Sequence, residues 1–294
     1  MNMRMRSLFN KICLMLLLLA MAGCSVIKVS YNNAQELTYW WLYSYVHFSD
    51  AQKPLIKAEL AALHDWHRFN EIPAYIKLLE SAQKKVMHDT TPEQVCAEVE
   101  NVRNRLRILN LQTEPIIEKL SPTLIHEQLG HMQKHFDKNN QKWQEDWMEG
   151  TQQERDEYRL KLAIERAEMF YGGLSDQQRD ILKDNIRIST FNAETSYEER
   201  LRRQADAIAT LKKIIDLKLA EPDIKLEIAA YFDRLQNGDD LAYQNYVDRL
   251  TVDSCAGFAR LHNSTSAKQR QRAADKLGGY IKDLEALKSS AQIR

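Results

Sequence analysis

Residues 92–113 read PEQVCAEVENVRNRLRILNLQT, and this stretch indicates the fold class. Its apolar residues recur at spacings of four, three, four and three, which places them on one face of an α-helix. They are Val95, Val99, Val102, Leu106 and Leu109. Similar spacing recurs along the chain, and no stretch alternates apolar and polar residues for long enough to predict a half-buried strand. The sequence therefore predicts an all-α fold.

Four expected helix starts share the pattern S/T-x-x-Q, namely Ser49–Gln52, Thr91–Gln94, Ser175–Gln178 and Ser266–Gln269. In such a capping box the hydroxyl and the glutamine satisfy each other's backbone amides. Pro54, Pro73 and Pro115 fall inside helical patterns and should end or kink them. These signals predict a multi-helix bundle of about ten helices, approximately at 33–47, 50–70, 73–88, 92–113, 122–149, 152–171, 176–190, 197–218, 223–236, 240–262 and 267–288.

Length, composition and charge limit the classes of protein that fit. The chain has 294 residues, 9 Gly and 6 Pro, with 41 basic and 41 acidic side chains. Scarce Gly and Pro disfavour sandwiches and barrels, which need frequent turns. A balanced charge gives no electrostatic reason to expect a nucleic-acid partner. We expect a single helical domain over residues 33–294, with two related helical halves as the alternative.

The N-terminus has the features of a secretory signal. Arg4, Arg6 and Lys11 precede an apolar run at 12–21, which is too short to span a bilayer. Ala22-Gly23-Cys24 follows, so the segment resembles a bacterial lipoprotein signal peptide over residues 1–23. The alternative is an ordinary secretory signal that happens to contain Cys24.

The lipoprotein resemblance implies a location. Cys24 would become the acylated N-terminus, followed by a short tether over residues 24–32, and two or more acyl chains anchor a protein stably. Ser25 follows the cysteine, where Asp would signal retention in the inner membrane. The resemblance thus implies the periplasmic face of the outer membrane, with the membrane as the first partner.

Two further cysteines remain after the signal. Cys13 leaves with the signal peptide, which leaves Cys96 and Cys255 in an oxidising compartment. An isolated pair there is a plausible disulfide, which requires Cα atoms within about 7 Å of each other. The alternative is two separate buried thiols.

Six aromatic residues lie within ten positions shortly after Cys24: Tyr39, Trp40, Trp41, Tyr43, Tyr45 and Phe48. One helix face cannot bury all of them, because Trp40 and Trp41 point about 100° apart. Either the bundle surrounds this helix, or the segment is an interaction patch against headgroups or another envelope protein.

Catalytic and metal-binding patterns are weak. His131 and His135 have a spacing that can chelate zinc, but His126 and His131 are one residue too far apart for HExxH. Glu80-Ser81 is similar to the catalytic dipeptide of helical lytic transglycosylases, without their other motifs. We predict no catalytic residue, metal or cofactor, and a cell-wall-modifying enzyme is the least favoured alternative.

Two family resemblances complete the interpretation. Phe48–Gln52 and Leu174–Gln178 are similar to the L-T-x-x-Q motif of small periplasmic helical chaperones. A wider resemblance, to an uncharacterised family of Gram-negative outer-membrane lipoproteins, rests on Cys24, Tyr31-Asn32-Asn33-Ala34, Trp41, Tyr45, Asp50-Ala51-Gln52, His67-Arg68, Ile72-Pro73-Ala74-Tyr75, Gln269-Arg270, Gly279-Tyr280-Ile281 and Leu284. We therefore expect a non-enzymatic envelope interaction or scaffold protein, with a chaperone-like binder of unfolded clients as the alternative.

Overall fold

A computed structural model describes residues 25–236, 238 and 240–289, and all regular elements in these ranges are helices. The all-α prediction is confirmed. The predicted signal peptide at 1–23 and Cys24 lie outside the described residues. None of the described helices is both long and apolar enough to cross a bilayer.

The helices follow one another through short connections. Their bounds are α2 (Ser25–Asn32), α3 (Ala34–Val46), α4 (Lys53–Trp66), the π-helix η1 (His67–Glu71), α5 (Ile72–Lys85), α6 (Pro92–Leu120), the 3₁₀ turn η2 (Ser121–Thr123), α7 (His126–Trp147), α8 (Gln152–Tyr171), α9 (Asp176–Ile188), α10 (Ala193–Leu217), α11 (Glu221–Gln236), α12 (Leu241–Asn263) and α13 (Ala267–Ser289).

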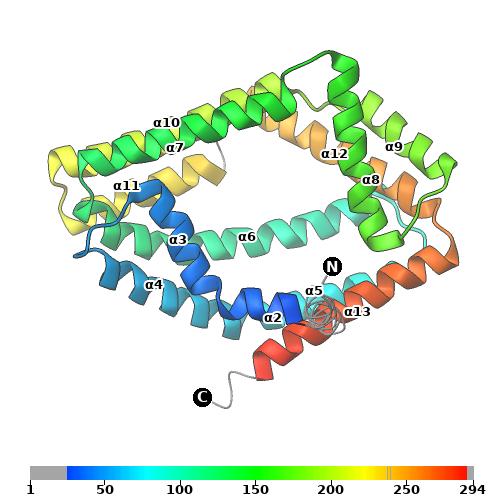
Figure 1. Cartoon of the computed structure of the whole chain (residues 1–294), viewed down its shortest axis with the longest axis horizontal. Coiled ribbons are helices and arrows are strands. Elements are labelled where there is room, and N and C mark those ends of the chain that lie inside the picture. The colour runs from blue at the N-terminus through cyan, green and yellow to red at the C-terminus, as the bar shows by residue number, and fades with distance from the viewer. Residues whose placement is uncertain (1–24, 237, 239, 290–294) are drawn as a thin grey trace, which may run out of the picture.

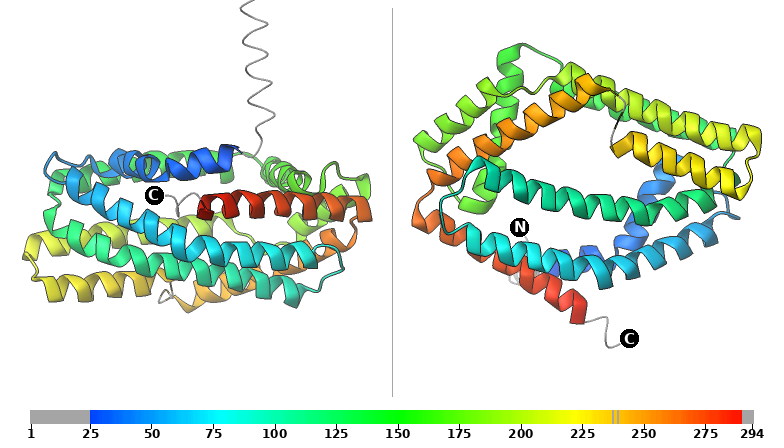
Figure 2. Two further views of the ribbon diagram at one scale, coloured as in Figure 1. Left: turned by 90° about the horizontal axis from the view of Figure 1, so that it is seen from below. Right: turned by 180° about the vertical axis from the view of Figure 1, so that it is seen from behind.

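The helices form an open frame that is thin when seen edge-on (Figures 1 and 2). Contacts run from α4 through α3, α7, α10 and α11 to α6, and from α6 through α12, α9, α8 and α13 to α5. The long helix α6 crosses the middle of the frame and also contacts α4 (Figure 1). The chain is therefore two linked circuits of helices that share α6.

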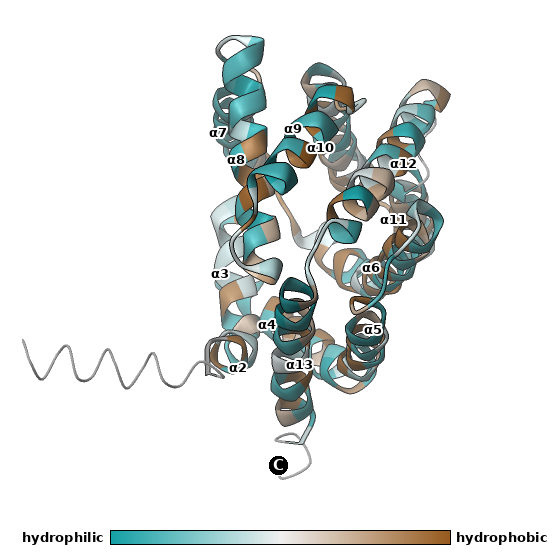
Figure 3. Cartoon of the chain, turned by 90° about the vertical axis from the view of Figure 1, so that its right-hand side faces the viewer, coloured by the Kyte–Doolittle hydropathy of each residue, from teal (hydrophilic) through white to brown (hydrophobic). Residues whose placement is uncertain are grey.

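Apolar packing is divided among several joints. Four clusters of buried residues centre on Ile56, Leu182, Ile72 and Ile228. Figure 3 agrees, because apolar bands lie on many helices and do not gather in one place. Most of the buried apolar residues of the described structure are thus divided among four small clusters and do not form one large core.

A pair of glutamine side chains joins the starts of α4 and α7. Gln52 and Gln128 exchange two amide hydrogen bonds, of 3.2 and 2.8 Å, and both side chains are buried. The Gln52 amide also donates to the carbonyl of Thr123 at 2.7 Å. The Gln128 amide donates to the carbonyl of His47 at 3.4 Å. We call this arrangement the first glutamine clasp.

The same arrangement joins the starts of α9 and α13. Gln178 and Gln269 exchange amide hydrogen bonds of 3.0 and 2.9 Å. Their amides also donate to the carbonyls of Ser264 and Gly173, each at 3.1 Å. Ser264 and Gly173 each stand two positions before the first residue of the opposite capping box, as His47 stands before Ser49 and Thr123 before Ile125 in the first clasp. This second glutamine clasp therefore matches the first bond for bond.

Most of the predicted capping boxes are present. The boxes at Thr91, Ser175 and Ser266 are complete. At Ser49 only the glutamine half forms, because residues 50–52 make a turn and α4 begins at Lys53. At the start of α7 the backbone amide of Ile125 also donates to the side chain of Gln128, three residues later. Ile125 has no hydroxyl, so the S/T-x-x-Q pattern does not predict this bond.

Two predicted helix starts are wrong. The helix expected from residue 122 begins at His126, because Ser121–Thr123 form a 3₁₀ turn. The helix expected from residue 197 begins at Ala193, where Asn192 caps it by accepting from the amide of Thr195.

The predicted disulfide is present and links α6 to α12. The Cα atoms of Cys96 and Cys255 lie 5.5 Å apart. Arg103 reinforces the same joint by donating to the Thr251 hydroxyl at 2.7 Å. The bond therefore ties the shared central helix to the C-terminal half of the chain.

Candidate functional site

An exposed apolar stripe follows α2 and α3. Trp40 and Trp41 are 60% and 58% exposed, and Val29 and Leu37 are also exposed. The spacing of Leu37, Trp40 and Trp41 places them on one side of α3, and backbone hydrogen bonds connect α3 to α2 through Asn33. Figure 2 shows α2 and α3 on one broad face of the frame. We call Val29, Leu37, Trp40 and Trp41 the aromatic surface.

The six aromatic residues of the predicted patch divide between core and surface. Tyr39 and Phe48 are buried in the cluster around Ile56. Tyr43 and Tyr45 are half-buried, and the Tyr45 hydroxyl accepts from the amide of Asn139 at 3.1 Å. The two tryptophans are thus the members of the patch that this packing leaves exposed.

Residues 24–32 were expected to form a tether, but from Ser25 onward they are helical and contact the frame. The Tyr31 hydroxyl and Nδ1 of His67 lie 2.9 Å apart and form a hydrogen bond, and Nε2 of His64 lies 3.0 Å from the Tyr31 carbonyl. The Arg68 guanidinium lies 5.3 Å from the centre of the Tyr31 ring. The helix after Cys24 is therefore held against η1.

Burial controls the charge of this contact. It raises the pKa of Tyr31 to about 12, against the opposing effect of Arg68. It also lowers the pKa of His67, and the neighbouring His64 lowers it further. Both shifts favour the uncharged forms, so a protonated tyrosine hydroxyl is paired with a neutral imidazole.

The π-helix η1 precedes Pro73 and is closed by the amide of Ile72, which donates to the carbonyl of His67. Such wide turns appear within helices at functional sites. Glu71 in η1 is 2% exposed, and its Oε1 lies 3.5 Å from Nη1 of Arg105 on α6. Its Oε2 is buried without a hydrogen-bond partner.

Two further buried polar atoms without a hydrogen bond occur in the same region of the described structure. They are Nε of Arg68 and Oδ1 of Asp283, whose carboxylate faces Lys28 of α2 at 3.8 Å. Unsatisfied buried polar groups are rare in native proteins. Their clustering around α2, η1 and α13 marks this region as unusual.

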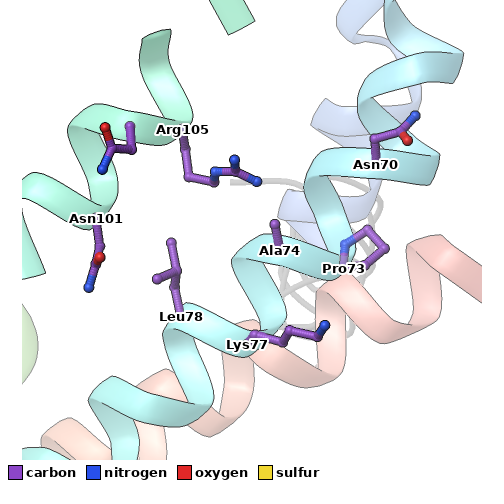
Figure 4. A pocket seen from close by; sticks show the side chains of 8 residues that line it. Asn70, Pro73, Ala74, Lys77, Leu78, Asn101 and Arg105 are labelled. Carbon is purple, nitrogen blue, oxygen red and sulfur yellow. The ribbon is translucent and has the colours of Figure 1, made fainter. Parts of the chain in front are cut away.

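Two open hollows flank α5 in this region. The first, of about 510 Å³, is lined by polar and small side chains: Asn70, Pro73, Ala74, Lys77, Leu78, Asn101, Asn104 and Arg105 (Figure 4). The second, of about 520 Å³, is lined by Ile27, Tyr75, Leu78, Leu79, Val102, Tyr280 and Leu284. Leu78 belongs to both, so a polar hollow and an apolar hollow meet at one side chain.

Sequence reasoning found neither hollow. Val102 and Leu106 share the apolar face that predicts α6, yet each is 53% exposed, and no residue of α6 is buried. The apolar face therefore predicts the helix α6 correctly, but part of that face lies at the surface of the protein and is not in the core. The interruption at Pro73 was the other usable signal, since it accompanies the π-helix.

The other weak candidates lie apart from these features. Among the described residues, no group of three or more His, Cys, Asp or Glu side chains is placed to hold a metal ion. His131 stacks near His47, with ring centres 4.2 Å apart, and His135 packs on Tyr45. Glu80 is exposed on α5.

These features define an all-helical frame with an exposed aromatic surface and two adjoining hollows. A family model described as a family of unknown function (DUF6279) matches residues 44–220, more than half of the chain. The chain belongs to this family. The match includes the polar hollow and Val102 but begins after Trp41. Searches of curated proteins and of solved structures give no match.

Proposed function

We propose that the protein is a non-enzymatic lipoprotein, anchored through Cys24 at the periplasmic face of the outer membrane, that binds another envelope protein. The observation that supports this function is the exposure of Trp40 and Trp41 on the helices that directly follow Cys24. Exposed apolar patches mark interaction sites, and tryptophan is enriched in binding hot spots.

The anchor and the aromatic surface lie close together along the chain. Because α2 begins at Ser25, no flexible tether separates it from Cys24. Trp40 stands sixteen positions after Cys24, which corresponds to about 24 Å along a helical path. A partner bound there would lie at the membrane surface or within it.

Photo-crosslinking in intact cells tests the binding surface. A photoreactive amino acid at Leu37 should capture a defined partner, and Trp40→Ala with Trp41→Ala should reduce capture about 10-fold or more. The matched control is Leu226→Ala on α11, because Leu226 is also exposed and lies away from this surface. Unchanged capture by the double variant would contradict the proposal.

Metabolic labelling tests the anchor independently. A fatty-acid analogue should label the wild type and leave Cys24→Ala unlabelled. Equal labelling of both proteins would reject lipidation at Cys24.

A second candidate function is the binding of unfolded envelope clients. Exposed apolar side chains away from α3 favour it, among them Leu106, Leu111, Leu201, Leu217 and Phe258. The protein should then suppress aggregation of a reduced, unfolded model protein, and Trp40→Ala with Trp41→Ala should retain this effect. Aggregation at the rate seen without the protein would reject the candidate.

A further inference from the structure

The polar and apolar hollows together have the form of a site for an amphiphile. They have similar volumes, of about 510 and 520 Å³, within the range of small-molecule sites. Figure 4 shows Leu78 pointing from α5 toward α6, where it forms a wall of the polar hollow. A molecule that crosses Leu78 would pass from polar to apolar surroundings.

The apolar hollow is built from four helices around the start of the described chain. Ile27 comes from α2, Leu79 from α5, Val102 from α6 and Leu284 from α13. The two tyrosines that line it, Tyr75 and Tyr280, add ring surface. Such a lining suits a flexible hydrocarbon chain.

The polar hollow favours an anion. Its charged lining residues, Lys77 and Arg105, are both cationic, and Asn70, Asn101 and Asn104 supply amide groups. Arg105 is positioned from behind by the buried Glu71, 3.5 Å away. A guanidinium and an ammonium are the usual partners of carboxylate and phosphate groups.

We propose that these hollows bind one single-chain anionic lipid, a fatty acid or a lysophospholipid. Lys77 and Arg105 hold its head, and its acyl chain passes Leu78 and packs on Leu79, Val102 and Leu284. The occupant is a free lipid, not the acyl chain on Cys24. An acyl chain linked covalently to Cys24 has no free anionic head, so it would bring no anion to Lys77 and Arg105.

The test uses the full protein in isolated membranes, so that any anchor is intact. The probe is free palmitate that carries a photoreactive diazirine and an alkyne, added to the membranes and activated by light. Labelling should saturate, and the labelled positions should fall within residues 74–79, 102–105 and 280–284. Unlabelled palmitate and lysophosphatidylglycerol should compete, and neutral hexadecanol should compete about 5-fold less well.

Two pairs of variants locate the site. Val102→Asp should reduce labelling about 10-fold, because it places a carboxylate beside the acyl chain. Leu106→Asp, one turn along the same helix and equally exposed at 53%, should leave labelling unchanged. Lys77→Glu should reduce labelling about 5-fold, whereas Lys84→Glu, also exposed on α5, should not.

Several outcomes would overturn the proposal. Equal labelling of Val102→Asp and Leu106→Asp would show that the acyl chain does not bind in the apolar hollow. Equal competition by palmitate and hexadecanol would show that the site does not recognise an anionic head. A second arm incorporates the diazirine lipid metabolically at Cys24. An internal crosslink from residue 24 to the apolar hollow would assign that hollow to the protein's own acyl chain. None of these results depends on capture of an envelope protein at Trp40 and Trp41.

Discussion

The N-terminal and C-terminal halves of the chain are built alike and differ in what they expose. In the first half α3 contacts α4 and α7, whose starts are joined by the first glutamine clasp. In the second half α8 contacts α9 and α13, whose starts are joined by the second. The two halves also exchange partners, because α7 packs on α10 and α13 packs on α5.

The difference lies on the outer sides of α3 and α8. The two halves can be aligned at Ser49 and Ser175. The connection from α8 to Ser175 is one residue longer than the connection from α3 to Ser49. With that allowance, Trp40 and Trp41 of α3 correspond to Glu165 and Arg166 of α8. Both of these charged residues are exposed. The same place in the fold is therefore filled by ordinary surface residues in one half, so the architecture does not require tryptophan in the other.

Only the first half contains the π-helix and the polar hollow. Glu71, Arg105 and Lys77 all belong to α5, α6 and η1, and the helices of the second half contain no π-helix within their described residues. The clasps and the helices that they join occur in both halves, so they are the shared framework of the fold. The features without a counterpart are the candidates for function.

The largest expected effect tests the link between the halves. Removing the disulfide with Cys96→Ala and Cys255→Ala should lower the free energy of unfolding by about 3–5 kcal/mol, since the bond closes a long loop. The sequence separation is 159 residues. Chemical denaturation of the double variant against the wild type measures this, and the reduced wild type is the control. A loss below about 1 kcal/mol would show that packing of α6 on α12 suffices.

The clasps should respond equally if the halves are equivalent. Gln52→Ala leaves the buried Gln128 amide without its partner, and Gln178→Ala leaves the half-buried Gln269 amide without its partner; each change should cost about 1–3 kcal/mol. Replacing both members, as in Gln52→Leu with Gln128→Leu, should cost more than either single change, because the backbone amides of Ser49 and Ile125 then both lose their side-chain acceptors. Denaturant midpoints compare the two clasps. A cost in one clasp more than about twice that in the other would contradict their equivalence.

A pH series probes a feature that both halves share. The Tyr31 hydroxyl bonds Nδ1 of His67 in the first half and the Tyr171 hydroxyl bonds Nδ1 of His262 in the second, each at 2.9 Å. Burial lowers the pKa of both imidazoles; His64 lowers that of His67 further, while the carbonyl of His88 partly opposes the shift of His262. The unfolded chain therefore binds more protons below about pH 6.5.

The free energy of unfolding should consequently be highest above about pH 6.5 and should fall as the pH drops through the lowered folded pKa values. His67→Gln and His262→Gln should each flatten this decline. His88→Gln, at an exposed position, is the control and should keep the slope. A slope unchanged in both buried variants would show that other groups cause the acid sensitivity.

The helices, the disulfide and the four S/T-x-x-Q boxes, of which three are complete, could be predicted from the sequence because they depend on local spacing and composition. The clasps could not be predicted, since pairing Gln52 with Gln128 depends on which helices meet. The sequence alone also could not decide which aromatic residues between Tyr39 and Phe48 are buried and which are exposed. Tyr39 and Trp40 are adjacent, and only the position of α4 and α7 buries one and leaves the other exposed.

The smallest expected change in stability is the sharpest test of the comparison. Trp40→Glu with Trp41→Arg places on α3 the residues that α8 presents at the corresponding positions. Both tryptophans are largely exposed, so the free energy of unfolding should change by no more than about 0.5 kcal/mol. Photo-crosslinking from Leu37 in cells should nevertheless be lost, because the binding surface is removed while the scaffold persists. A matched change at buried Tyr39, Tyr39→Ala, should instead cost about 3 kcal/mol or more. If the charged variant unfolds as readily as Tyr39→Ala, the tryptophans belong to the packing of the frame and the difference between α3 and α8 has a structural origin.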